Sequence, residues 1–82
     1  MNLTLLFSAL DTKPFRPFTL ELVSGTPVDI DHPDNVFILP NRQTVHHIEV
    51  FGPGPTVRAL IWPGGLVGLF YDGENGNGGA RP

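Results

Sequence analysis

Three histidines and a group of aspartates are the residues of this chain that suggest metal or hydrolytic chemistry. The histidines are His32, His46 and His47, and Asp31 and Asp34 lie close to the first of them. Because successive residues of a strand point to opposite faces, we do not expect His46 and His47 to bind one ion together. A zinc-type site would need His32, one further histidine and a carboxylate close together. The spacing of these residues in the sequence does not require them to meet. We therefore expect ordinary polar histidines, with no metal and no cofactor.

Asp29, Asp31 and Asp34 form an acidic cluster around a His-Pro turn. Paired carboxylates act as general acid and base when burial separates their pKa values. Asp29 and Asp31 share one strand face and are expected to be solvated, and Asp34 is expected to cap the turn. No serine lies in a nucleophile-elbow context, and no glycine-rich loop joins a strand to a helix start. The sequence therefore predicts no catalytic site.

Arg16 lies between two Pro-Phe pairs in the segment Pro14–Phe18. Its guanidinium is either exposed and stacked on aromatic rings, ready for a carboxylate or phosphate, or bonded to helix-end carbonyls or Asp11. We favour the second, structural role. Under the alternative in which the chain binds a nucleotide, the pocket is expected to be formed by His32, Asp34, Asn35 and Arg16.

The elements that position these residues follow from hydrophobic periodicity. One helical face is apolar over the first turns and consists of Leu3, Leu6, Phe7 and Leu10. This spacing predicts a helix over residues 2–11, capped by Asn2 or Thr4 and ended before Pro14. Alternating segments between turn signals then predict strands near residues 15–23, 26–31, 36–39, 44–51, 56–62 and 66–71.

This pattern predicts a mainly β (α+β) fold. A short N-terminal helix precedes a five- to six-stranded antiparallel bent sheet or small barrel. Residues 1–71 are expected to form a single barrel-like domain, whose last two strands pair as a C-terminal hairpin. Residues 72–82, rich in glycine and asparagine, are expected to form a flexible tail.

Composition narrows the classes of partner. The formal net charge is −3, and the five basic residues are scattered singly rather than gathered in a stripe. Nucleic-acid binding is possible but disfavoured, because phosphate backbones attract clustered Lys and Arg. We see neither a secretory leader nor an apolar stretch long enough to cross a bilayer, so we expect a cytoplasmic protein that does not bind membranes.

Apolar residues near the C-terminal strands are more numerous than one small core can cover. The chain of 82 residues has no cysteine, so no disulfide supplies the stability that a small hydrophobic core lacks. Exposed apolar patches are commonly partner surfaces, with tryptophan and tyrosine favoured at their centres. The residues predicted to form such an interface are Phe51, Leu60, Trp62, Leu69 and Tyr71. The competing interpretation is that the N-terminal helix covers them within one chain.

Two resemblances add to this reading. The segment 13–25, with its Pro-Phe-Arg-Pro-Phe start, followed by His32-Pro33-Asp34, resembles a group of small uncharacterised bacterial proteins, and no function follows from it. The order of helix, Ser24-Gly25 hairpin, Asp34-Asn35 and a late Ile61–Leu66 hairpin is similar to Sm-like proteins, a variety of small SH3-like barrel. That resemblance implies ring assembly and RNA binding. Trp62-Pro63 stands where the family has a basic residue, so assembly is implied more strongly than RNA binding.

We therefore expect a non-enzymatic protein-interaction or assembly module that binds itself or another protein, self-associating through the C-terminal hairpin. The first alternative is an Sm-like RNA or nucleotide binder. The second is a small metal-dependent enzyme that uses His32 with Asp31 or Asp34.

Overall fold

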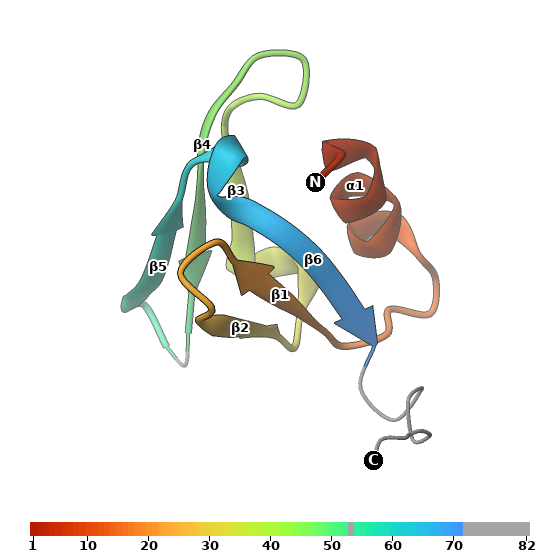
Figure 1. Ribbon diagram of the computed structural model, residues 1–82. Coiled ribbons are helices and arrows are strands. Elements are labelled where there is room, and N and C mark those ends of the chain that lie inside the picture. The colour runs from red at the N-terminus through yellow and green to blue at the C-terminus, as the bar shows by residue number, and fades with distance from the viewer. Residues whose placement is uncertain (53, 72–82) are drawn as a thin grey trace.

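The computed structural model describes residues 1–52 and 54–71, so the predicted tail at 72–82 lies outside the described residues. The described part of the chain forms one short helix followed by six strands and two 3-10 turns. Figure 1 shows their arrangement. The helix α1 spans Leu3–Asp11. The strands are β1 (Phe18–Leu22), β2 (Pro27–Ile30), β3 (Val36–Pro40), β4 (Val45–Phe51), β5 (Val57–Ile61) and β6 (Leu66–Tyr71). The 3-10 turns are η1 (Pro33–Asn35) and η2 (Pro63–Gly65).

The six strands form two antiparallel sheets, with orders β2-β1-β6 and β3-β4-β5. Within residues 1–52 and 54–71 no strand ladder joins the two sheets, so they do not close into a barrel. The predicted mainly β fold with an N-terminal helix is confirmed, and the predicted single bent sheet or small barrel is corrected to two sheets. The chain passes between them at η1 and η2, each of which begins with a proline.

The predicted C-terminal hairpin is wrong. β5 pairs with β4, and β6 pairs with β1, so the last two strands belong to different sheets. Pro63 opens the 3-10 turn η2 between them, where a two-residue hairpin turn would have kept both strands in one ladder. Consequently the apolar residues of β5 and β6 do not form one continuous surface by pairing.

The core lies between the inner faces of the two sheets and under α1 (Figure 1). Phe18 and Leu20 of β1 are fully buried, as strand alternation predicts for one face. From the helix, Leu6 and Leu10 of the predicted apolar face are buried, together with Ala9. In the part of the chain that the structure describes, the buried apolar residues are Leu6, Ala9, Leu10, Phe18, Leu20, Val28, Ile30, Ile48, Val50, Ile61 and Leu66.

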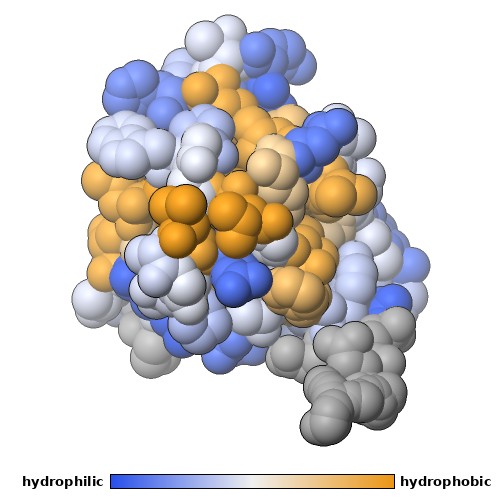
Figure 2. All heavy atoms as spheres, in the orientation of Figure 1, coloured by the Kyte–Doolittle hydropathy of each residue, from blue (hydrophilic) through white to orange (hydrophobic). Residues whose placement is uncertain are grey.

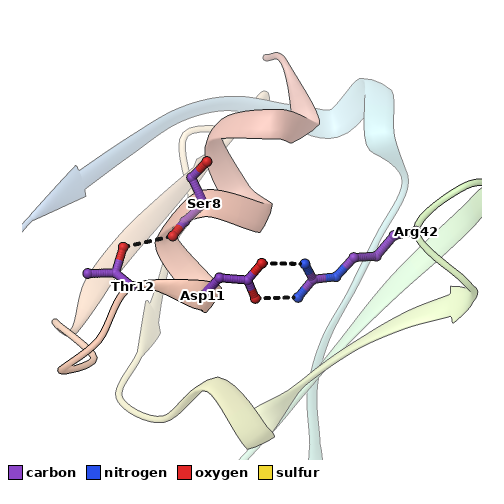
Figure 3. Close-up of polar contacts among 4 residues, drawn as sticks. All are labelled: Ser8, Asp11, Thr12 and Arg42. Carbon is purple, nitrogen blue, oxygen red and sulfur yellow. Dashed lines mark hydrogen bonds and ion pairs between the residues drawn. The ribbon is translucent and has the colours of Figure 1, made fainter.

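Polar contacts close both ends of α1 and tie the helix to the β3–β4 loop. Asn2 Oδ1 accepts a hydrogen bond from the Thr4 amide at 2.8 Å, which confirms Asn2 as the cap. At the other end, the Thr12 hydroxyl donates to the Ser8 carbonyl at 2.7 Å (Figure 3). Asp11 receives two parallel bonds from Arg42, at 2.7 and 2.9 Å (Figure 3). This paired geometry holds the end of the helix against the sheet β3-β4-β5.

Because Asp11 and Arg42 form an ion pair, we expect the unfolding free energy to fall in acid, where the Asp11 carboxylate becomes protonated. The hydrogen bonds from Arg42 lower the pKa of the Asp11 carboxyl below its ordinary value. The pair therefore stabilises the fold at pH values above the unfolded-state pKa of aspartate, and this contribution disappears as the pH falls through the lowered folded-state pKa. Arg42→Gln is expected to flatten the decline of unfolding free energy between about pH 5 and pH 2, measured by urea denaturation at a series of pH values.

Arg58→Gln is the matched control for this experiment, because Arg58 donates to the backbone carbonyl of Asp29 and not to a carboxylate. That variant should keep the pH dependence of the wild type. An Arg42→Gln protein whose stability falls with acid as steeply as that of the wild type would contradict the assignment.

Candidate functional site

The outer face of the sheet β3-β4-β5 carries large apolar side chains at positions fixed by the strand register. Ile38, Ile48 and Ile61 lie opposite one another and point toward the core side. The next row along the strands therefore points outward, and it consists of Phe37, Glu49 and Leu60. We call this surface the outer face and define it by Phe37, Leu39, His47, Glu49, Phe51, Leu60 and Trp62.

Large apolar side chains on the outer face are half exposed. The exposed fractions are 49% for Phe37, 53% for Leu60 and 54% for Trp62. The ring of Phe37 packs edge-on against Phe51, with centroids 5.2 Å apart. Side chains of this size that are kept at a common surface rather than in the core are typical of a contact surface for another molecule.

Other exposed apolar residues lie elsewhere on the molecule. Figure 2 shows apolar side chains in a band across the middle of the face on which β1 and β6 lie, with hydrophilic side chains above and below it. The position of one of these exposed side chains, Phe70, is explained by a contact within the molecule. A Cβ at Gly68 would lie only 3.1 Å from the ring of Phe70, so the Phe70 ring covers the bare backbone of that glycine.

The five residues predicted as an interface divide between two locations. Phe51, Leu60 and Trp62 belong to the outer face, but Leu69 and Tyr71 lie on the inner face of the other sheet. Leu69 pairs with Leu20 and Tyr71 with Phe18, and both pack partly buried against the core. The predicted interface residues are divided in this way because β5 and β6 belong to different sheets.

Phe37 is a residue of the outer face that our sequence reasoning missed. The segment 36–39 is apolar on both faces, which already indicated that each face needs a cover. With Val36 and Ile38 facing the core, alternation leaves Phe37 outside. The signal for this residue was therefore present in the sequence, but the choice between the two faces required the strand register.

A cluster of two histidines and Trp62 occupies one end of the outer face. His46 Nδ1 and His47 Nδ1 are 2.8 Å apart and share a hydrogen bond. His47 Nε2 is 3.2 Å from Glu49 Oε2. The ring of Trp62 meets both imidazoles edge-on, with centroid distances of 5.4 Å to His46 and 5.8 Å to His47.

A β-bulge brings the two histidines together. Leu39 is opposite His47, but the next residue, Pro40, is opposite Val45, so His46 is an extra residue on β4. A bulge interrupts the alternation of side chains and redirects the extra one. The expectation that the side chains of His46 and His47 point to opposite faces is therefore wrong.

The residues expected to form a nucleotide pocket are not gathered in one place. His32 and Asn35 line a cleft of about 460 Å³, together with Asp31, Phe51, Gly52, Gly54 and Arg58. Asp34 instead lines a second cleft, of about 480 Å³, beside Asp11 and Arg42 at the end of α1. The guanidinium carbon of Arg16 lies 4.2 Å above the centre of the Tyr71 ring. Arg16 therefore stacks on an aromatic ring, while Asp11 is paired with Arg42.

The acidic cluster is also dispersed. Asp29 Oδ1 accepts a hydrogen bond from the Thr19 hydroxyl at 2.9 Å, within the β1–β2 ladder. Asp34 lies inside η1, whose cap residue is His32, and no side-chain hydrogen bond caps this turn. The predicted capping by Asp34 is therefore not seen. Among residues 1–52 and 54–71, no group of three or more His, Cys, Asp or Glu side chains is arranged to hold a metal ion.

Comparisons with known proteins do not indicate a function for this chain. No protein-family model matches the chain, and neither a curated protein nor a solved structure matches it. In the described part of the chain, no helix has the length and apolar character needed to span a membrane. The outer face and the His46–His47–Trp62 cluster are the features that remain to be explained.

Proposed function

We propose that this protein is a non-enzymatic interaction module that self-associates through the outer face of the sheet β3-β4-β5. The observation that carries the proposal is the exposure of Phe37, Leu60 and Trp62, each about half accessible, on one sheet face. Removing apolar surface from water contributes about 25 cal/mol per Å². Covering these three side chains thus supplies a driving force for association.

A second copy of the chain is the occupant that this surface fits best. A twofold contact uses the same patch on both partners, so each residue must find its complement within that patch. The outer face carries Glu49 at the centre of its apolar row and His47 two residues away. In a contact between two antiparallel copies, the carboxylate of one copy can approach the imidazole of the other, while the surrounding apolar side chains cover each other.

Strand edges extend the surface available for association. Within residues 1–52 and 54–71, β3 and β5 each pair with β4 alone, so one edge of each strand has no ladder partner. Open edges are templates for pairing with another chain. A stable interface buries about 800 Å² on each partner, and the outer face together with a strand edge supplies more surface than the face alone.

The element order also supports an assembly role. The helix, the hairpin at Ser24-Gly25 and Asp34-Asn35 follow one another in the order for which the sequence resembles Sm-like proteins, whereas the late hairpin of that resemblance is absent, since β5 and β6 lie in different sheets. The RNA or nucleotide alternative has less support, because His32, Asp34, Asn35 and Arg16 line no common cleft. The alternative of a metal-dependent enzyme using His32 with Asp31 or Asp34 also has less support. Asp31 lines the same cleft as His32 but Asp34 lines another, and no group of three or more possible metal ligands occurs among residues 1–52 and 54–71.

Size-exclusion chromatography with light scattering tests the proposal. The wild type is expected to show a mass above that of the 8.9 kDa chain, rising with protein concentration. Leu60→Glu places a second negative charge beside Glu49 in the apolar row, and it should raise the dissociation constant at least about tenfold, a cost of roughly 1.4 kcal/mol.

The matched control is Val67→Glu, because Val67 is 51% exposed but lies in β6, away from the outer face. This variant should associate as the wild type does. A wild type that remains an 8.9 kDa monomer at every concentration would refute the proposal, as would equal effects of the two substitutions.

A further inference from the structure

Glu49, His47 and His46 form a short chain of hydrogen bonds at one end of the outer face. Oε2 of Glu49 lies 3.2 Å from Nε2 of His47, and Nδ1 of His47 lies 2.8 Å from Nδ1 of His46. An ionised carboxylate only accepts hydrogen bonds, so Nε2 of His47 carries the ring proton. Nδ1 of a neutral His47 is then the acceptor, and Nδ1 of His46 is the donor.

The number of protons on the pair decides whether the bond between the rings exists. A first added proton goes to Nε2 of His46, which lies outside the chain of bonds, and the two rings stay joined. A second added proton has to go to Nδ1 of His47, which is the last lone pair. Both Nδ1 atoms are then donors, and two donors cannot share a hydrogen bond. Because histidine changes charge between about pH 5 and pH 8, mild acid breaks the bond.

Glu49 is the charged group that faces the pair. Among residues 1–52 and 54–71, the strands and the turn packed against β4 bring no other charge to this end of the sheet. Leu39 and Pro40 lie opposite on β3, and η2 contains only proline and glycine. Arg58, the charged residue of β5, lies toward the other end of that strand and donates to the Asp29 carbonyl. One carboxylate therefore compensates only one of two imidazolium charges.

Opening of the pair changes the outer face itself. The ring of Trp62 meets the rings of His46 and His47 edge-on, at centroid distances of 5.4 and 5.8 Å. His46 is exposed, so the repulsion between two imidazolium rings is relieved when its ring turns into solvent, away from His47 and Trp62. A second copy that covered this end of the outer face would then bury an unpaired positive charge, which is costly.

We propose that the His46–His47 pair is a proton-operated switch that releases self-association in mild acid. This inference rests on the proposed function, but the opening of the pair takes place within one chain and can be measured separately. The β-bulge in β4 makes the switch, because regular alternation would place the two rings on opposite faces. Protonation of histidine clusters at about pH 5–6 alters interfaces in other pH-sensing proteins.

NMR spectroscopy of the wild type tests the opening of the pair. At about pH 8 the imidazole nitrogen signals should place the proton on Nε2 of His47 and on Nδ1 of His46, with a nuclear Overhauser effect between the rings of His46 and Trp62. At about pH 5 both rings should be fully protonated and that effect should be lost. His32 is the internal reference, because it lies in the cleft beside Asn35 and its titration should leave the Trp62 signals unchanged. Ring contacts that persist unchanged in acid would overturn the proposal.

Light scattering at the same two pH values tests the release of association. The wild-type dissociation constant is expected to be at least about tenfold higher at the lower pH. His46→Gln removes the uncompensated charge at an exposed position, so its dissociation constant should change by less than about threefold. His32→Gln is the matched control and should keep the full wild-type response, and circular dichroism verifies the folding of both variants.

Two outcomes of the light-scattering experiment would overturn the proposal. The first is an equal response of His46→Gln and His32→Gln to pH, and the second is a wild type that associates equally well at both pH values. A wild type that is monomeric throughout would instead refute the proposed function, and the release of association with it. The NMR titration would then still decide whether the histidine pair opens.

Discussion

Phe18→Ala is expected to destabilise the protein by about 3–5 kcal/mol. Phe18 has no exposed surface, and its ring meets Phe15 and Tyr71 at centroid distances of 5.8 and 6.2 Å. In the β1 ladder it lies between Ile30 on one side and Tyr71 on the other, so its truncation opens a cavity at the centre of the sheet β2-β1-β6. Domains have about 0.05–0.15 kcal/mol of stability per residue, so a loss of this size removes a large share of the unfolding free energy of an 82-residue chain. Urea denaturation followed by circular dichroism measures it.

Phe37→Ala is the control that separates burial from residue type. Phe37 is 49% exposed and packs against Phe51 on the outer face, so its truncation is expected to cost about 1 kcal/mol or less. Equal losses of stability in the two phenylalanine variants would show that the assignment of inner and outer faces is incorrect. The comparison therefore also tests the surface on which the proposed self-association depends.

Gly52→Ala is expected to lower the unfolding free energy by about 1–3 kcal/mol. Gly52 follows β4 with a φ of +105°, a backbone region that residues with a side chain rarely adopt. The added Cβ would also lie 3.3 Å from Nδ2 of Asn35, so the amide side chain would have to shift. Urea denaturation reports the loss, and a change in the amide signals of Asn35 in NMR spectra would report the displacement.

Gly64→Ala is the comparison for Gly52→Ala. Gly64 lies in η2, has no positive φ, and has no atom within 4 Å of the position that a Cβ would take. This substitution is expected to be neutral or to stabilise the protein by up to about 1 kcal/mol, because alanine restricts the unfolded chain more than glycine does. If both alanine variants lose the same stability, the strain assigned to Gly52 is not the cause.

Several elements were predictable from the sequence because they depend on residues close together in the chain. The spacing of Leu6 and Leu10 predicted the buried side of α1, and Asn2 was correctly expected as a possible cap. The turn at Gly25 was predicted from residue type, and this glycine has a φ of +90°. The strand at 66–71 has the predicted bounds. Periodicity and turn chemistry are local properties, so a single sequence contains them.

Only the tertiary structure decided how the strands pair and what that pairing exposes. The sequence determined that 36–39 and 66–71 are apolar strands, but it did not determine that β5 and β6 enter different sheets. Neither did it predict the bulge at His46, because a bulge is a mismatch between two strands and each strand looks regular by itself. Side-chain alternation is set by the neighbouring residues of one strand, whereas the partner, the register and the outward face are set by contacts between residues far apart in the chain. For this reason the outer face and the histidine pair appear only in the folded protein.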